Sequence, residues 1–220
     1  VIVNNGGKHS LYLAMAALLD PGDEVIIPTP YWVTYSEQPR LMGAEPVIVE
    51  TLPENGLKLT AAEFRAAFTS RTKMLVLNSP SNPSGAVYSR DELQALAQVA
   101  VERGVYVLSD EIYEKMVYGE ARHHSIAGLG GGIKDLTIVV NGVSKAYAMT
   151  GWRIGYAGAT AEVIAGMNKV QSQEISHPSS ISQKAAVTAL TGPQETVAQM
   201  RRAFDERRRY MVARLNALPG

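Results

Sequence analysis

Short apolar, β-branched runs alternate with stretches of helical periodicity along most of the chain, a pattern typical of a mainly parallel sheet covered by helices. Several runs are apolar throughout, as expected of strands buried on both faces. The pattern therefore predicts an α/β fold of three layers, in which helices cover both faces of a mostly parallel seven-stranded sheet. The seven predicted strands are Val1–Val3, Glu24–Ile27, Glu45–Val49, Lys73–Leu77, Val105–Ser109, Leu136–Val140 and Ile154–Ala157.

Helix starts are marked by two capping boxes, in which a hydroxyl residue is followed three positions later by Glu, at Thr60–Glu63 and Ser89–Glu92. The helix after Ser89 is expected to end at Gly104. From Ala161 onward, successive helices replace the alternation, with breaks at 177–178 and 192–193. We therefore predict a sheet domain over residues 1–192, and in residues 193–220 the start of a charged helix that leaves it.

Composition narrows the possible functions. The chain has 220 residues, 46% of them hydrophobic, with 21 basic and 21 acidic residues and no cysteine. A zero net charge favours neither nucleic acid nor membrane as a partner, so any anion site must be local. The absence of cysteine excludes disulfides, thiolate catalysis and Cys-ligated metals. The chain carries neither a long apolar run nor a signal-peptide pattern, and we predict a cytoplasmic protein.

Polar residues follow the predicted strands at the sheet edge where ligands of parallel sheets bind. Asn4-Asn5-Gly6-Gly7-Lys8 follows the first strand and fits either a phosphate turn or a plain tight turn. Two prolines in the segment 78–85 would hold the Asn82 amide rigidly over the edge. Asp110 follows a buried strand, where burying a carboxylate is costly unless the carboxylate meets a cation. The alternative interpretation is that Asp110 caps the start of a helix.

Lys145 stands among small and apolar residues after the sixth predicted strand. Taken alone it is either a snorkelling surface lysine or a desolvated amine that acts as a nucleophile. Five groups would meet at one edge of the sheet. They are this lysine, a buried carboxylate at Asp110, a rigid amide at Asn82, a phosphate turn and a second cation at Arg153. Pyridoxal 5'-phosphate (PLP) requires such a set, because it needs a Schiff-base lysine, an acid for its ring nitrogen and an anion site.

At these positions the chain resembles the fold-type I PLP enzymes, specifically the class I aminotransferases, and most closely their prokaryotic aspartate aminotransferase branch. The resemblance spans essentially the whole chain and implies the large PLP-binding domain of that fold. The segments that carry it are Asp20-Pro21-Gly22-Asp23-Glu24-Val25, Pro30-Tyr31-Trp32, Asn78 to Gly85, Ser109-Asp110-Glu111-Ile112-Tyr113, Ser144-Lys145 and Gly151-Trp152-Arg153-Ile154-Gly155-Tyr156.

The resemblance implies roles for the residues around the cofactor ring. Lys145 would bind the cofactor as a Schiff base and then move a proton between the substrate α-carbon and the cofactor. Asp110 would pair with the ring nitrogen and keep it protonated. Asn82 and Tyr113 would hydrogen-bond the ring 3'-oxygen, with Asn82 also touching the substrate carboxylate. Trp32 would stack on the ring face and contact the substrate.

The phosphate end of the cofactor is assigned in the same way. By resemblance, Arg153 and the backbone N–H groups of Gly7 and Lys8 would hold the phosphate. Three residues before the lysine, some branches carry a phosphate-binding hydroxyl, whereas this chain has Gly142. We expect Ser144 to compensate.

The implied activity is transfer of an amino group between an L-amino acid, aspartate-like or aromatic, and a 2-oxo acid such as 2-oxoglutarate, by a ping-pong cycle. Two alternatives remain open: a β-elimination lyase or synthase of the same fold, and a PLP-sensing regulatory domain. The family's N-terminal segment would precede Val1, and its carboxylate-binding arginine would follow Gly220. We therefore expect the chain to be a fragment of a protein that is a homodimer when full length.

Three other signals point to ordinary surface structure. The glycine-rich segment 128–133 precedes a strand, whereas a dinucleotide fingerprint follows one, so we predict a loose surface loop. The four histidines show no metal-binding spacing, and no metal is predicted. The arginines of the last helix share it with Asp205 and Glu206, which favours a solvated ion-pair face over a nucleic-acid site.

Overall fold

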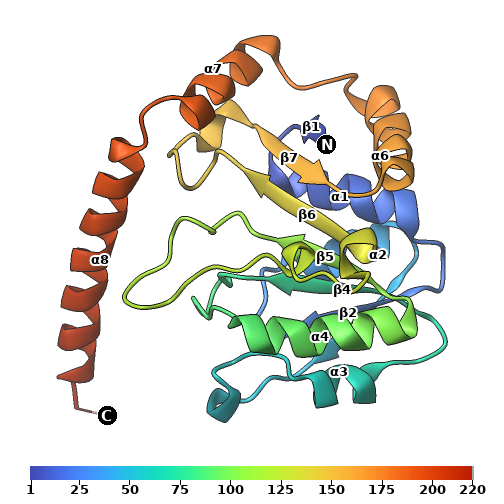
Figure 1. The fold of residues 1–220 in the computed structure, drawn as a ribbon, viewed down its shortest axis with the longest axis horizontal. Coiled ribbons are helices and arrows are strands. Elements are labelled where there is room, and N and C mark those ends of the chain that lie inside the picture. Colours follow the sequence, from blue (N-terminus) through green and yellow to red (C-terminus); the bar gives the residue numbers. More distant parts are fainter. Residues whose placement is uncertain (220) are drawn as a thin grey trace.

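The computed structural model describes residues 1–219 and contains a seven-stranded sheet with the order β1-β7-β6-β5-β4-β2-β3 (Figure 1). Strands β2 to β6 pair in parallel, whereas β7 runs antiparallel to both β6 and β1. The seven predicted strands are confirmed, with ends displaced by at most two residues. They are β1 (Ile2–Asn4), β2 (Glu24–Pro28), β3 (Glu45–Val49), β4 (Thr72–Asn78), β5 (Tyr106–Asp110), β6 (Thr137–Gly142) and β7 (Gly155–Gly158).

Helices cover both faces of the sheet. One face carries α1 (Gly7–Leu18), α2 (Thr34–Leu41) and α6 (Ala161–Glu174), and the other carries α3 (Ala61–Ala67), α4 (Arg90–Arg103) and α5 (Ile133–Leu136). The remaining helices are α7 (Ser180–Thr191) and α8 (Glu195–Asn216), with short 3₁₀ turns at Pro53–Asn55, Ile126–Gly128 and Thr150–Trp152. The predicted three-layer α/β architecture is confirmed.

The side-chain alternation of β4 divides the core into two halves. Met74 and Val76 pack toward α1 and α6, whereas Leu75 and Leu77 pack toward α3 and α4, and all four are at most 2% exposed. Successive strand residues point to opposite faces, so an uninterrupted apolar run is what a two-sided strand requires. The sheet is thereby fixed between its helices, and the strand ends form a rigid edge.

Both predicted capping boxes are present: the Thr60 hydroxyl accepts the N–H of Glu63, and the Ser89 hydroxyl accepts that of Glu92. Gly104 ends α4 in the left-handed conformation, with φ 65°. The breaks after α6 and α7 lie where the sequence placed them, and α8 begins at Glu195.

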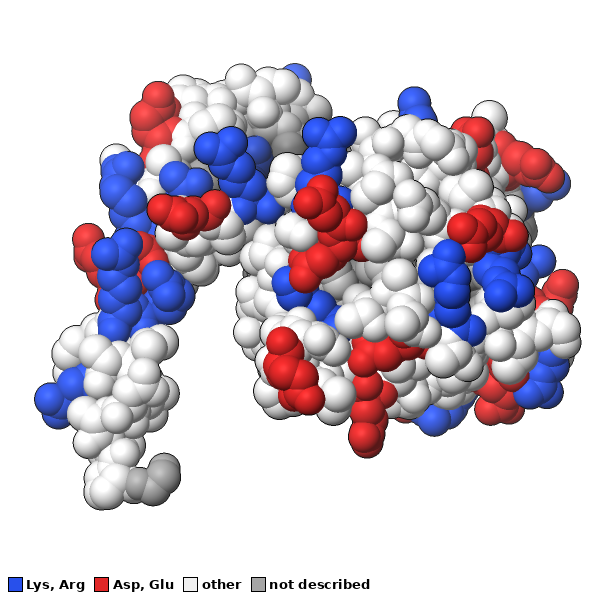
Figure 2. Space-filling view, turned by 60° about the horizontal axis from the view of Figure 1, so that its bottom comes forward, with Lys and Arg blue, Asp and Glu red and all other residues white. Residues whose placement is uncertain are grey.

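Helix α8 has no buried residue and extends away from the sheet (Figure 1). Asp205 pairs with Arg208 and Arg209 at 2.7 Å, which confirms the predicted ion-pair face. Figure 2 shows acidic and basic side chains intermixed along this helix. Arg208 also stacks on Tyr118 of the sheet domain, 5.4 Å from the ring centre. None of the helices within residues 1–219 has both the length and the apolar character needed to cross a membrane.

The glycine-rich segment 128–133 is only partly the loose loop that we expected. Gly130 to Gly132 are exposed, but Ile126–Gly128 forms a 3₁₀ turn and Ile133 begins α5. Ile126 and Ile133 are at most 1% exposed and pack against α4. The prediction was wrong at the two ends of the segment, because Gly128 belongs to the 3₁₀ turn and the buried Ile133 belongs to α5.

Candidate active site

All nine predicted site residues line one cavity of about 280 Å³ at the carboxyl ends of β1, β4, β5 and β6. Segments far apart in the sequence thus meet at one sheet edge, as the strand pattern predicted. The predicted residues are Gly7, Lys8, Trp32, Asn82, Asp110, Tyr113, Ser144, Lys145 and Arg153. The lining also contains three residues without a predicted role, Tyr35, Ile112 and Thr150.

Asp110 is held at the end of β5 with 4% of its surface exposed. The hydroxyl of Tyr35 donates a hydrogen bond to its Oδ2 at 2.8 Å, and the N–H of Ile112 donates to its Oδ1 at 3.1 Å. Burial raises the pKa of Asp110 to about 6, against the lowering effects of these hydrogen bonds and of the Lys145 charge. Residues 112–115 form a turn, so the helix-capping alternative is wrong.

Asn78 joins the two strand ends that carry Asn82 and Asp110. Its Oδ1 accepts the N–H of Asn82 at 2.7 Å, and its Nδ2 donates to the carbonyl oxygen of Asp110 at 2.9 Å. The Asn78 side chain itself is outside the cavity lining, whereas Asn82 is part of it. The backbone at Asn82 is therefore held by a neighbouring side chain as well as by prolines, and the rigidity of the Asn82 side-chain amide stays a prediction.

The turn of residues 5–8, called the glycine turn below, leads from β1 into α1. Gly6 has φ 86°, and a Cβ at Gly6 would collide with the guanidinium group of Arg153. Only glycine both adopts this positive φ readily and leaves room for the Arg153 side chain. The N–H groups of Gly7 and Lys8 have no acceptor within residues 1–219 and lie at the positive end of the α1 dipole.

Arg153 is placed by the connection between β6 and β7. Its Nη1 donates to the carbonyl oxygen of Thr150 at 2.9 Å, and the Thr150 hydroxyl donates to the carbonyl oxygen of Ser144 at 3.0 Å. These two bonds fold the connection so that Ser144, Lys145 and Arg153 line the same cavity. Thr150 could have been anticipated, since it lies inside the segment that joins the predicted lysine and arginine.

Two lysines line the cavity, and both lie beside aromatic rings. The Lys145 Nζ is 5.6 Å from the centre of the Tyr113 ring, and the Lys8 Nζ is 4.7 Å from the centre of the Trp32 ring. Lys145 is exposed, so the interpretation of a desolvated amine is wrong for this structure. Its amine is instead accessible from the cavity.

Close packing explains why this chain has glycine at position 142. A Cβ on Gly142 would lie 2.8 Å from the carbonyl oxygen of Ile154 and 3.1 Å from the Cα of Gly155. A hydroxyl side chain therefore has no room there. Ser144, two residues later, is 7% exposed and lines the cavity, so it places a hydroxyl-bearing residue there.

Glu111 follows the last residue of β5 and organises the loop that carries Tyr113. Its carboxylate accepts hydrogen bonds from the Ser109 hydroxyl at 3.0 Å and the Ser125 hydroxyl at 2.7 Å. The Nε2 of His123 is 3.0 Å from the other oxygen. These contacts close the loop onto itself. Possible metal-ligating atoms of Glu111, His123 and Glu114 lie within 4.8 Å of one another, although Glu111 already makes these contacts.

Tyr35 is the most informative residue that the sequence analysis missed. It lies in α2, which residues 29–33 separate from the end of β2, and its partner Asp110 is 75 residues away. The available signal was its spacing, because Tyr35 follows Trp32 by three residues, one helical turn. The two rings are in edge contact, with centroids 5.6 Å apart.

Comparisons with known proteins agree with this architecture. The family model of aminotransferase classes I and II matches residues 1–220. The aspartate aminotransferase of Geobacillus stearothermophilus is 51% identical over the whole chain, which covers 56% of that protein. The crystal structure of the Rhizobium meliloti aspartate aminotransferase superposes with a TM-score of 0.97 at 50% identity, covering 99% of this chain and 55% of that one.

An aromatic aminotransferase structure from Pyrococcus horikoshii matches with a TM-score of 0.94 at 40% identity, covering 97% of this chain and 58% of that one. The chain thus spans a little over half the length of the relatives it matches. The predicted fold-type I architecture is confirmed by these structures. Because the family model matches from the first residue to the last, the chain belongs to the class I and II aminotransferase family.

Proposed function

We propose that the full-length protein is a PLP-dependent aminotransferase. It would transfer an amino group between an L-amino acid, aspartate-like or aromatic, and a 2-oxo acid such as 2-oxoglutarate, in a ping-pong cycle. One observation carries this proposal: a single cavity is lined by Lys145, by the buried Asp110, and by Arg153 together with Gly7 and Lys8 of the glycine turn. The relatives named above are aspartate and aromatic aminotransferases, which supports the reaction type.

The donor set of the cavity fits the three reactive parts of PLP. It offers an accessible amine for an aldehyde, a buried carboxylate for a ring nitrogen, and free N–H groups with a guanidinium for a phosphate. When bound, PLP supplies an electron sink for the electron pair released at a substrate α-carbon. The remaining chemistry belongs to the side chains of this chain.

Arg153, Gly7 and Lys8 would bind the phosphate. The two N–H groups at the start of α1 have no other acceptor within the described residues, and the guanidinium of Arg153 packs against Gly6 beside them. A helix N-terminus and a guanidinium both favour a doubly charged anion. Ser144 would add a hydroxyl donor from the β6 side.

Asp110 would hold the ring nitrogen in its protonated form. Its pKa of about 6 reflects burial, which outweighs the lowering effects of its two hydrogen bonds and of the Lys145 charge. An N–H cation against the carboxylate would lower this pKa, so Asp110 would be ionised when it makes that contact. Tyr113 and Asn82 would orient the opposite side of the ring, and Trp32 would cover one face and contact the substrate.

Lys145 would bind the cofactor covalently and then act as the base that moves the substrate α-proton. Lys145 is exposed in the cavity, so its amine would be free to reach both the cofactor and the substrate α-carbon. The Tyr113 ring beside it limits where the side chain lies. A proton-transfer group in hydrogen-bond reach of the reacting atom is what this step requires.

The remaining proposals concern the whole protein. Residues 1–192 would form the central part of the large domain, and residues 193–220 would begin the helix toward a small domain. A homodimer and a cytoplasmic location are expected from the resemblance and the sequence. The lyase, synthase and regulatory alternatives receive no support from the relatives, whose names are those of aminotransferases.

The test is steady-state transamination by the full-length protein, with aspartate, aromatic and branched-chain donors offered together with 2-oxoglutarate. We expect glutamate to form with an aspartate or aromatic donor and parallel-line ping-pong kinetics. Lys145→Ala should abolish turnover. Release of ammonia without glutamate would instead support elimination chemistry and overturn the proposal.

A further inference from the structure

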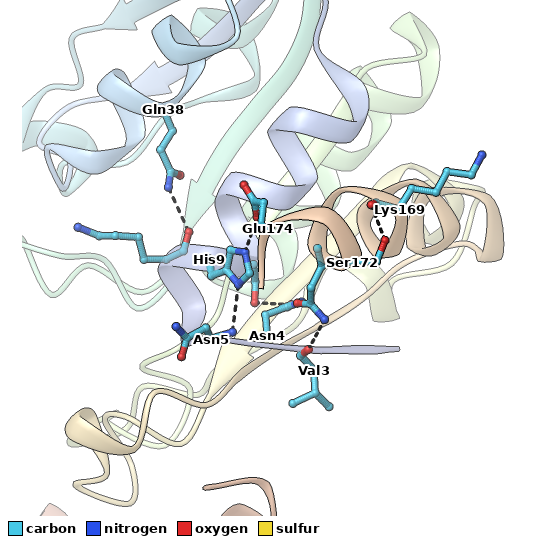
Figure 3. Close-up of polar contacts among 11 residues, drawn as sticks. Val3, Asn4, Asn5, His9, Gln38, Lys169, Ser172 and Glu174 are labelled. Atoms are coloured by element: carbon cyan, nitrogen blue, oxygen red, sulfur yellow. Dashed lines mark hydrogen bonds and ion pairs between the residues drawn. The ribbon is translucent and has the colours of Figure 1, made fainter. Parts of the chain in front are cut away.

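Helix α6 contacts the residues on either side of the glycine turn through two side chains that lie one helical turn apart: Gln171 contacts Asn4, and Glu174 contacts His9 (Figure 3). Elsewhere, α1 and α6 meet through apolar residues such as Val163 and Met167, which are at most 6% exposed. The polar contacts are thus concentrated at the end of α6 that adjoins the turn. The apolar contacts can hold the two helices together without them.

A buried hydrogen-bond chain first fixes the end of β1. The Ser10 hydroxyl donates to Asn4 Oδ1 at 2.8 Å, and Asn4 Nδ2 donates to Gln171 Oε1 at 2.7 Å. Gln171 Nε2 then donates to the carbonyl oxygen of Val3 at 3.1 Å. Asn4, Ser10 and Gln171 are each at most 3% exposed. The strand end and the first helical turn are therefore tied to α6 on either side of the glycine turn.

His9 supplies the contact to the turn itself. The backbone N–H of Asn5 donates to His9 Nδ1 at 3.2 Å, so this ring nitrogen acts as an acceptor. The ring proton must then be on Nε2, which lies 2.9 Å from Glu174 Oε2 and donates to it. Glu174 thereby selects the tautomer in which His9 can hold the N–H of Asn5.

This contact matters for the neighbouring N–H groups. With the Asn5 N–H engaged by His9, the next N–H groups without an acceptor in the described residues are those of Gly7 and Lys8, two residues that line the cavity together with Arg153. From the opposite side, Gln38 Nε2 donates to the carbonyl oxygen of Lys8 at 3.1 Å. The direction of the free N–H groups is therefore set by side chains outside the cavity.

We propose that His9 and Glu174 are positioning residues for phosphate recognition: Glu174 orients His9, and His9 holds the glycine turn so that its free N–H groups point at the anion. This inference rests on the proposed PLP function. Neither residue lines the cavity, so their effect on a ligand passes through the turn. It should therefore be specific to the phosphate end of the cofactor.

The test compares PLP with pyridoxal, which lacks the phosphate, by measuring both dissociation constants for the full-length protein at equilibrium. We expect His9→Ala and Glu174→Ala each to weaken PLP binding by about five-fold to ten-fold, the effect of one lost hydrogen bond near an anion. Pyridoxal binding should change less than about two-fold. The double variant should bind PLP no more weakly than the single variant with the larger PLP dissociation constant, because Glu174 acts only through His9.

Two control variants sharpen the result. Glu174→Gln keeps an acceptor for His9 and should bind PLP nearly as the parent does. Glu162→Ala removes the same charge from the exposed first turn of α6 and should leave PLP binding unchanged. Equal weakening of PLP and pyridoxal, no weakening of either, or additive single effects would overturn the inference. A parent protein that binds PLP no more tightly than pyridoxal would instead overturn the proposed phosphate site.

Discussion

The Tyr35 hydroxyl donates a 2.8 Å hydrogen bond to the Asp110 carboxylate across a sequence separation of 75 residues. Both groups are buried, and the pKa of Tyr35 is raised well above its usual value by burial and by the Asp110 charge. Tyr35 therefore stays a proton donor at all working pH values. The Tyr35 bond to Oδ2 and the Ile112 N–H bond to Oδ1 together fix the orientation of the Asp110 carboxylate.

Tyr35→Phe should lower kcat for transamination by about three-fold to ten-fold, because a buried carboxylate loses one hydrogen bond. The same loss should raise the pKa of Asp110, since the Tyr35 bond lowers it. Tyr31→Phe is the matched control, as Tyr31 lies outside this cavity. Equal kcat values for Tyr35→Phe and the parent would show that Asp110 is oriented without Tyr35.

The raised pKa of Asp110 predicts a pH-dependent stability of the cofactor-free protein. Its folded-state pKa of about 6 exceeds the unfolded value near 3.8, so its contribution is fully present below pH 3.8 and is lost as pH rises through about 6. Between pH 5 and pH 7, this carboxyl group should cost about 1 kcal/mol of unfolding free energy.

Asp110→Asn should remove that cost, because an amide of the same shape does not ionise. The measurement is urea unfolding of cofactor-free parent and variant at pH 5 and pH 7, with the variant expected to gain on the parent at the higher pH. A constant difference between the two proteins would contradict the burial argument. With cofactor, the same variant should retain some binding but lose most of its transamination rate.

Gly142→Ala should lower the free energy of unfolding by about 1–3 kcal/mol, the usual cost of forcing atoms into a packed site. The new Cβ would lie 2.8 Å from the Ile154 carbonyl oxygen. Gly158→Ala is the control, because a Cβ on Gly158 meets no atom within 4 Å. Urea unfolding of both variants gives the comparison. Equal stabilities would mean that β6 and β7 can separate at no cost.

The strands and most helices could be predicted because burial requires apolar residues at regular positions, and this spacing is visible in the local sequence. Strand β4 is apolar at successive positions since both of its faces are covered, and Ser89 with Glu92 marks a helix start through a local hydrogen-bond pair. Asp110 and Lys145 were found by the same logic. Each follows a buried strand, and parallel strands bring their carboxyl ends together.

The rest of the site depends on contacts that have no local signature. His9 looks like any polar helix residue, and its role follows only from the position of Glu174, 165 residues later. Lys145 was open to two interpretations because exposure is decided by surrounding segments rather than by its neighbours in the chain. Ile133 was placed in a loop because its core contacts come from α4.

The central claim is that Lys145 is the amine that binds the cofactor. The most direct test is borohydride reduction of the PLP-loaded full-length protein, which makes the bond permanent, followed by peptide mapping. Lys8 is the internal control, because it lines the same cavity with its Nζ over Trp32. We predict that the pyridoxyl group is found on Lys145 at about one per chain, and that Lys145→Ala carries none. A label on Lys8, or one that survives in Lys145→Ala, would contradict the account.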